Sequence, residues 1–214
     1  MEGNAHLEVE VKVLVHDLEA VRQRLAATAG ARQVKPRVHE VNIRYDDAGA
    51  TLTPAGIVLR LRRDTPVEGE GGVPRARLTY KAPARQERAG VHARVEYEVT
   101  VGDFDEMDAI LQLLGYHTAL IYEKYRTTYE LDGAEVVLDE MPFGAFVEVE
   151  GAADAIEAAL AHLGLASAPR ILESYVVLFE RVKARLGLAF RDLTFENFTG
   201  VAVPPGAFDP QDGR

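Results

Sequence analysis

Charged and apolar residues alternate along at least six segments of the chain. In the first, residues 7–13, valines separate Glu8, Glu10 and Lys12. Successive side chains of a β-strand point to opposite faces, so these three charged residues share one face and the valines share the other. The pattern predicts strands with one charged and one apolar face.

The remaining segments repeat this alternation, and their charges sort by sign. They are residues 57–62 with Arg60 and Arg62, 75–81 with Arg77, Thr79 and Lys81, 94–99 with Arg94, Glu96 and Glu98, 123–128 with Lys124, Arg126 and Thr128, and 146–150 with Glu148 and Glu150. Two further strands are predicted at residues 41–45 and 135–139, the second of which ends at Asp139. Eight strands result.

Four stretches instead repeat apolar residues at the helical spacing of three and four. These stretches are residues 17–29, 103–114, 153–163 and 172–186, and each is followed by a glycine at 30, 115, 164 or 187. Asp17 is a suitable N-terminal cap for the first helix, and the glycines are typical helix stops. The sequence therefore predicts strands interrupted by four amphipathic helices.

Together these elements predict an α+β fold. Strands linked by hairpins favour an antiparallel sheet, and strands with one charged face can close into a barrel with a polar interior. We expect an eight-stranded antiparallel β-barrel with a charged interior, and with the helices packed outside on the apolar face. Residues 1–190 are predicted to form this domain. Residues 191–214 are predicted to be a C-terminal extension that is partly loose.

Composition narrows the class of protein. A chain of 214 residues can bury a sizeable core, and the lack of cysteine excludes disulfides and thiolate metal sites. A net charge of −10 argues against nonspecific binding to a nucleic acid polymer. Because there is no 18-residue apolar run and the start is polar, we expect a cytoplasmic protein without a membrane partner.

A charged interior is physically reasonable only if a ligand fills it. Like charges in an empty tunnel would repel each other, whereas a polyanion and divalent cations would neutralise both sets. The basic side chains would then hold phosphates, and the acidic side chains would hold metal. The sequence thus indicates a site for a phosphate-rich small molecule.

The residues that define these strands resemble a known family. Glu8, Glu10 and Lys12 form an ExExK pattern similar to the signature of the CYTH superfamily, the triphosphate tunnel metalloenzymes. The resemblance extends over about residues 6–182 and also includes the basic strands and the Glu148 and Glu150 pair. Asn42 stands where relatives often carry an acid. The family includes class IV adenylate cyclases, thiamine triphosphatases, inorganic triphosphatases and RNA triphosphatases.

The resemblance implies a role for each charged position. The triphosphate would be bound by Lys12, Arg60, Arg62, Lys81, Arg94, Lys124 and Arg126. The metal, Mg²⁺ or Mn²⁺, would be held by Glu8, Glu10, Asp139, Glu148 and Glu150. The catalytic residues would be Lys12 and Glu10. Arginine offers a bidentate fork to phosphate and lysine a point charge, while carboxylate oxygens suit hard divalent cations.

Several roles have open alternatives. Asp139 precedes a turn and could cap it, and Glu96 and Glu98 could hold a second metal or form ion pairs with neighbouring arginines. Lys12 could deprotonate an attacking water, but neighbouring acids favour its charged form and therefore a positioning role. Tyr175 lies in an apolar helix stripe, which favours core packing over substrate contact.

Three functions are consistent with these residues. The first is a divalent-metal-dependent phosphohydrolase acting on inorganic or small organic triphosphates. This function requires the fewest residues, because no pocket for adenine is needed. The second is a class IV adenylate cyclase that converts ATP to cyclic AMP and pyrophosphate. The third is a non-catalytic binder of polyphosphate or nucleotides. The expected partner is a small triphosphate substrate, with a homodimer as an open alternative.

Overall fold

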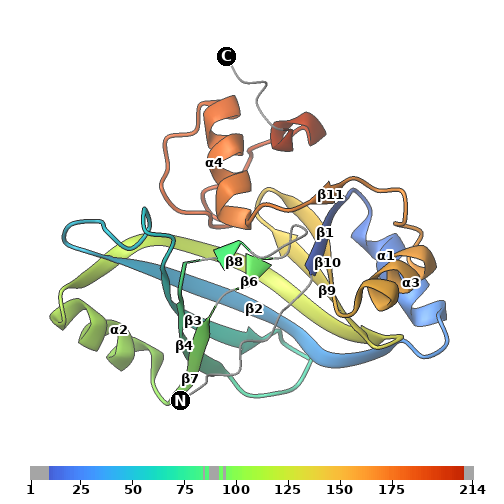
Figure 1. The fold of residues 1–214 in the computed structure, drawn as a ribbon, viewed down its shortest axis with the longest axis horizontal. Helices are drawn as coiled ribbons and strands as arrows, with labels where there is room; N and C mark the ends of the chain where they lie inside the picture. The colour runs from blue at the N-terminus through green and yellow to red at the C-terminus, as the bar shows by residue number, and fades with distance from the viewer. Residues whose placement is uncertain (1–9, 84, 87–91, 94, 210–214) are drawn as a thin grey trace.

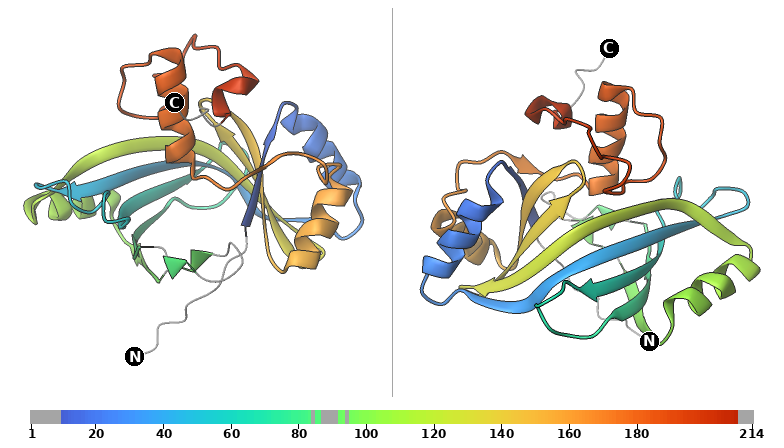
Figure 2. Two further views of the ribbon diagram at one scale, coloured as in Figure 1. Left: turned by 45° about the horizontal axis from the view of Figure 1, so that its top comes forward. Right: turned by 180° about the vertical axis from the view of Figure 1, so that it is seen from behind.

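One antiparallel sheet of nine strands organises the molecule (Figures 1 and 2). The computed structural model describes residues 10–83, 85–86, 92–93 and 95–209. In spatial order, the strands are β11 (Arg170–Ile171), β1 (Glu10–Val15), β10 (Gly144–Glu150), β9 (Ala134–Met141), β8 (Tyr116–Leu131), β2 (Arg32–Asp47), β3 (Val58–Pro66), β4 (Arg75–Lys81) and β7 (Glu96–Val101). A separate pair joins β5 (Arg85–Gln86) to β6 (His92–Ala93).

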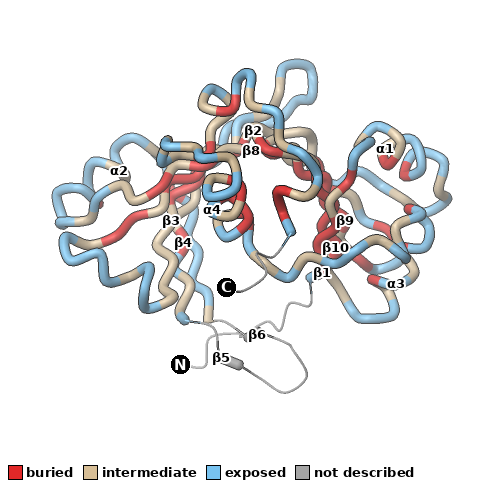
Figure 3. Tube along the Cα trace, turned by 90° about the horizontal axis from the view of Figure 1, so that it is seen from above, coloured by how far each residue is buried: buried red, intermediate tan, exposed pale blue. Residues whose placement is uncertain are grey.

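The structure confirms the predicted α+β class, but the sheet is open rather than a closed eight-stranded barrel. Within the described residues, β11 and β7 are edge strands, and each has one neighbour in the sheet. The sheet nevertheless curves strongly, so that β3 and β4 lie on one side of α4 and β9 and β10 on the other (Figure 3). Alternation fixes the two faces of each strand, whereas closure also depends on tilt and register, which alternation does not specify.

Three helices cover the apolar outer face of the sheet, as expected. The helices α1 (Leu18–Ala27) and α3 (Ala153–His162) share one hydrophobic cluster with β1, β9 and β10, in which Leu25 and Leu160 are buried. The third helix, α2 (Phe104–Leu113), packs Leu111 against a second cluster that contains Ile43 and Leu61. Asp17 caps α1 as predicted, because its side chain accepts a hydrogen bond from the Ala20 amide.

The fourth helix lies on the opposite, charged side of the sheet. This helix, α4 (Tyr175–Leu186), buries Tyr175 and Phe179 in a cluster with Tyr122 and Phe146. Phe146 alternates with Val147 and therefore points to the same face as Glu148. The prediction of helices packed outside thus holds for α1, α2 and α3, while α4 occupies the inner face.

The residues after α4 continue this inner packing. Leu193 pairs with Tyr122 in a parallel bridge, and its amide and carbonyl bond to β8 at Ile121 and Glu123. Phe198 and the short helix η1 (Pro205–Phe208) join the cluster around α4. We call α4 and residues 188–208 the C-terminal layer. The predicted C-terminal extension falls within this layer, where Leu193, Phe198, Ala207 and Phe208 are buried.

None of the helices in the described part of the chain is both long and apolar enough to cross a membrane.

Candidate functional site

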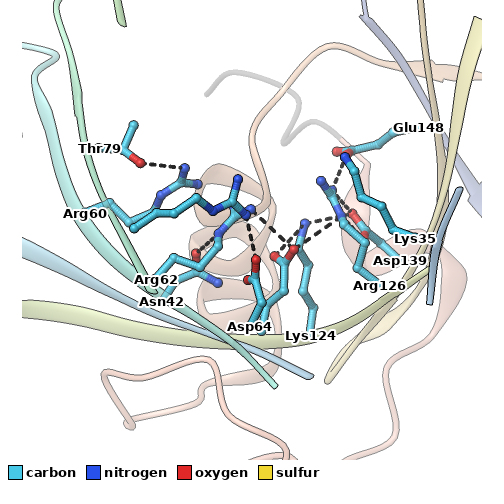
Figure 4. Close-up of polar contacts among 12 residues, drawn as sticks. Lys35, Asn42, Arg60, Arg62, Asp64, Thr79, Lys124, Arg126, Asp139 and Glu148 are labelled. Carbon is cyan, nitrogen blue, oxygen red and sulfur yellow. Dashed lines mark hydrogen bonds and ion pairs between the residues drawn. The ribbon is translucent and has the colours of Figure 1, made fainter. Parts of the chain in front are cut away.

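The charged face of the sheet carries a dense network of buried ion pairs (Figure 4). At its centre, Arg126 donates to both oxygens of Asp139, at 2.7 and 2.5 Å, and to Glu148 at 2.5 Å. Lys124 lies 3.1 Å from Asp139. The Tyr175 hydroxyl donates to the same carboxylate at 2.8 Å. Three groups from two elements thus surround a carboxylate that is fully buried.

The electrostatic consequence is that Asp139 remains ionised. Burial alone would raise its pKa, but Arg126 and Lys124 hold that pKa well below its ordinary range. The turn-cap alternative for Asp139 is not what the structure shows, since its side chain points to these cations. Tyr175 packs in the core as expected, because its ring lies against Phe146, and its hydroxyl also donates to Asp139.

Sequence reasoning missed Glu40, which belongs to the same network. Its side chain is buried and lies 3.3 Å from Arg62, 3.5 Å from Lys124 and 3.9 Å from Arg126. Burial would raise its pKa, but Lys124, Arg62 and Arg126 lower it to about 2. The available signal was alternation in β2, where Glu40 and Asn42 share a face with Val41 between them. We call Glu40, Lys124, Arg126, Asp139 and Glu148 the inner cluster.

Lys12 bridges two of the predicted metal ligands. Its ammonium lies 3.1 Å from Glu10 and 3.1 Å from Glu148, and it also donates to the Glu173 carbonyl at 3.3 Å. Burial would lower its pKa, yet Glu148 and Glu10 raise it above the ordinary value. Lys12 therefore stays protonated, which supports a positioning role and argues against a general base.

The arginines of β3 reach toward β2, β4 and β8. Arg62 donates to the Asn42 side-chain oxygen at 2.8 Å, and Arg60 contacts the hydroxyls of Tyr122 at 3.4 Å and Thr79 at 3.3 Å. Burial would raise the Tyr122 pKa, but Arg60 and Arg62 lower it to about 8. Tyr122 is a second residue that sequence reasoning missed, although it lies two positions before Lys124 on the same strand face.

Two buried nitrogen atoms in this region have no hydrogen-bond acceptor among the described residues. These are Nδ2 of Asn42, whose residue is fully buried, and Nε of Arg60. Buried donors are nearly always paired in folded proteins, because an unpaired one forfeits its bond to water. Ligand oxygen atoms would be suitable acceptors for these donors, and the carboxylate oxygens Oε2 of Glu40 and Oδ1 of Asp64 are likewise buried without a hydrogen-bond donor among the described residues.

A more exposed group of charges occupies β4 and β7. Lys81 lies 2.7 Å from Glu96, and Arg77 pairs with Asp64 at 2.6 Å and Glu98 at 3.1 Å. Of the two alternatives for Glu96 and Glu98, the structure shows ion pairs. We call Arg77, Lys81, Glu96 and Glu98 the outer cluster.

The structure brings most of the predicted site residues onto one face, with two left outside it. Glu8 and Arg94 lie outside the described residues. Glu150 shares a face with Glu148 and is the register partner of Glu10. The predicted phosphate ligands Arg62, Lys124 and Arg126 meet at the inner cluster. Arg60 lies beside Tyr122 and Thr79, 4.0 Å from Glu98, and Lys81 lies in the outer cluster.

The metal ligands remain a prediction, which can be tested against donor chemistry. In the part of the chain that the structure describes, no group of three or more His, Cys, Asp or Glu side chains is arranged to hold a metal ion. The carboxylates are instead in ion pairs with lysine and arginine. However, burial and the neighbouring Asp139 raise the Glu148 pKa, despite Arg126 and Lys124. The oxygens of Glu148, like those of Glu10 and Glu150, are still hard donors of the kind that a divalent cation prefers.

Comparison with known proteins identifies the family. The sequence profile of the CYTH domain matches residues 6–165, so the chain belongs to the CYTH domain family. No curated protein matches significantly. The region from α4 onward, which supplies Tyr175 to the site, lies beyond the matched residues.

Solved structures share this fold at low sequence identity. A proposed adenylate cyclase from Vibrio parahaemolyticus is 19% identical, with a TM-score of 0.65 over 83% of this chain and 99% of its own. The PH1819 protein from Pyrococcus horikoshii OT3 is 25% identical, with a TM-score of 0.63 over 81% and 99%. A proposed adenylyl cyclase from Hippeastrum, described as having a dominant triphosphatase activity, is 16% identical, with a TM-score of 0.57 over 81% and 94%.

Proposed function

We propose that the protein is a divalent-metal-dependent phosphohydrolase that acts on inorganic or small organic triphosphates. The observation that carries this proposal is the pair of buried, unpaired donors at Asn42 and Arg60 within a face rich in arginine and lysine. Phosphate oxygens are the acceptors that such donors lack. Membership of the CYTH family supports the same substrate class.

The side chains have distinct parts in this reaction. Arg60, Arg62, Lys124 and Arg126 would bind the phosphate chain and stabilise the negative charge that develops on the leaving oxygen. Lys12, held protonated by Glu10 and Glu148, would orient the terminal phosphate rather than remove a proton.

A divalent cation would be held by Glu8, Glu10, Glu148 and Glu150, with Asp139 nearby. When bound, Mg²⁺ or Mn²⁺ would supply Lewis acidity and neutralise phosphate charge. In the proposed hydrolysis, a water oxygen bonds to the terminal phosphorus as the bridging phosphorus–oxygen bond breaks. The products are diphosphate and orthophosphate, and the proton passes to solvent.

Cyclisation of ATP is the second candidate. Here the ribose 3′ oxygen would attack the α-phosphate and pyrophosphate would leave, again with stabilisation by the arginines. The names of two of the similar structures favour it, whereas the activity described for the Hippeastrum protein favours hydrolysis. Hydrolysis requires fewer features, because no adenine site is needed.

The decisive experiment incubates purified protein with tripolyphosphate, thiamine triphosphate or ATP, each with Mg²⁺ or Mn²⁺, and separates the products by ion exchange. We expect orthophosphate with at least one substrate. Cyclic AMP with pyrophosphate would establish the cyclase instead. Binding without any product would make the protein a non-catalytic binder, and either outcome would overturn the proposal.

Adjacent arginines on opposite faces of β3 provide a matched control. Arg62 lies in the buried network, whereas Arg63 points to the outer face, 3.6 Å from Asp105 and over the ring of Phe104. We expect Arg62→Met to lower kcat/KM by about a hundredfold, as for loss of a charge-stabilising donor. Arg63→Met should leave kcat/KM within about twofold of the original, since it removes equal charge away from the site.

A further inference from the structure

The two edge strands of the sheet differ in length. At one edge, β11 has only two residues, whereas β7 at the other edge has six (Figure 1). Within the described residues, β4 is the only strand that pairs with β7 in the sheet. β7 contains neither lysine nor proline, the residues that commonly keep an exposed edge strand from pairing. It is therefore the longer and less protected edge of the sheet.

The pairing with β4 identifies the backbone groups of β7 that remain available. The Ala82 amide donates to the Val95 carbonyl just before β7 begins. Every second residue of an antiparallel strand bonds to a given neighbour, so the odd-numbered residues of β7 direct their N–H and C=O groups to β4. The same groups of Glu96, Glu98 and Thr100 point away from β4. These three residues offer the hydrogen-bonding groups that a further strand requires.

The apolar outer face of β4 and β7 is covered at one end only. Ala76 and Val101 are register partners, and both are buried in the cluster that includes α2. Further along the same face, Val99 is 57% exposed and Tyr97 is 60% exposed. The Tyr97 ring lies 6.4 Å from the ring of Tyr80, measured between centroids. An exposed apolar patch beside an unpaired strand edge favours association with another chain.

The opposite face of β7 carries charges that are already paired. Glu96 lies 2.7 Å from Lys81, and Glu98 lies 3.1 Å from Arg77. Glu98 also accepts a hydrogen bond from the Thr79 hydroxyl at 2.8 Å. A strand added at this edge would therefore meet little uncompensated charge, provided that its own glutamates do not lie directly opposite these two.

A second copy of β7 satisfies that condition in one register. When a strand pairs antiparallel with its own copy about a two-fold axis, the residue on the axis opposes itself. With Tyr97 or Glu98 on the axis, glutamates of the two copies would face each other, which is destabilising. With Thr100 on the axis, Tyr97 would lie beyond the end of the other strand. With Val99 on the axis, Tyr97 opposes Val101 and Glu98 opposes Thr100, so like charges are kept apart.

We propose that the protein forms a homodimer in which the two β7 strands pair antiparallel about a two-fold axis through Val99. The free backbone groups of Glu98 in one copy then bond to those of Thr100 in the other. The two sheets become one continuous sheet, and their charged faces lie on the same side of it. Each charged face is complete within its own copy, so this inference does not depend on the proposed function.

Sedimentation velocity at about 1 and about 100 µM protein measures the association. We expect a dimer at the higher concentration. Val99→Lys places two ammonium groups at the axis and should raise the dimer Kd by about tenfold or more. The matched control Val73→Lys makes the same change at an exposed position between β3 and β4, and should dimerise as the original does. A monomeric original protein, or equal Kd values for the two variants, would overturn the proposal.

Because the chain has no cysteine, single cysteine variants test the register directly. Val99→Cys places two thiols in an opposed pair whose Cα atoms are about 4.5 Å apart, within the range of a disulfide. In the same register, the two cysteines of Tyr97→Cys are about 13 Å apart along the strands. We expect oxidised glutathione to link Val99→Cys into covalent dimers on non-reducing gels and to leave Tyr97→Cys unlinked. Equal linking of the two variants, or none in Val99→Cys, would overturn the register.

Thiol labelling detects any other occupant of this edge. In freshly reduced Val99→Cys, we expect a thiol-reactive dye to react slowly at high protein concentration and rapidly after dilution, because the dimer shields the thiol. Slow labelling at every concentration would show that another segment of the same chain covers β7. Rapid labelling at every concentration would show that the edge stays unpaired, and either result would overturn the homodimer.

Discussion

The inner and outer clusters arise from the same alternation of charge along strands, yet they differ in their surroundings. Asp139 of the inner cluster is fully buried between Arg126, Lys124 and Tyr175. Glu98 of the outer cluster is about one-third exposed and pairs with Arg77 in partial contact with water. Buried charges depend on their partners for several kcal/mol, whereas exposed pairs contribute about 0–1 kcal/mol. One sequence pattern therefore produces both a buried network of coupled charges and a set of weak surface pairs.

The largest expected effect on stability comes from replacing Arg126, the arginine at the centre of the inner cluster. Arg126→Met leaves Asp139 and Glu148 with fewer partners while they remain buried, and should lower the free energy of unfolding by about 3 kcal/mol or more. The matched change in the outer cluster, Arg77→Met, should cost less than about 1 kcal/mol. Urea denaturation measures both, and losses of equal size would refute the distinction between the clusters.

An intermediate effect concerns pH. The folded pKa of Glu40 is about 2 and its ordinary value is 4.5, so its stabilising contribution is complete above about pH 4.5 and is lost as pH falls toward 2. Glu40→Gln should therefore reduce stability by about 3 kcal/mol at neutral pH and flatten the acid dependence between pH 4.5 and 2. Melting temperatures across this range test the prediction.

The control for that experiment is Glu130→Gln, which removes an exposed carboxylate that pairs with Arg32 on the protein surface. Its acid dependence should follow that of the original protein. If Glu40→Gln and Glu130→Gln gave the same curves, the inner cluster would not be the source of acid sensitivity.

The smallest effect is expected at Lys81 and Glu96. A double-mutant cycle with Lys81→Met and Glu96→Gln should give a coupling energy below about 1 kcal/mol, because both side chains reach solvent. Added salt should reduce this coupling further, since exposed charges are screened. A coupling comparable to that of Arg126 and Asp139 would place both clusters in one network.

Much of the fold follows from sequence periodicity alone. The four helices fall where apolar spacing places them, and the charged residues of β1, β3, β8 and β10 share the expected face. Phe146 also carried a signal, because it interrupts the charged positions ahead of Glu148 and Glu150. That interruption marks the point at which the face becomes covered.

The side on which α4 packs could not be predicted in the same way. Its apolar stripe resembles those of α1 and α3, and the choice of face depends on contacts with Tyr122 and Phe146, which are far away in sequence. Glu40 was missed because charged and apolar residues alternate over only a short part of its strand. The open sheet was missed because closure depends on geometry at the edges rather than on alternation.

The position of β1 has a consequence for the order of folding. This early strand bonds to β10, and the Lys12 ammonium reaches the Glu173 carbonyl, a separation of 161 residues. Contacts between such distant parts of a chain slow folding, because the entropy of closing a long loop is lost before the contacts that stabilise it can form. During synthesis, Val11, Val13 and Phe146 would stay exposed to solvent until the later segments that cover them emerge. A chaperone would bind these apolar side chains during that interval.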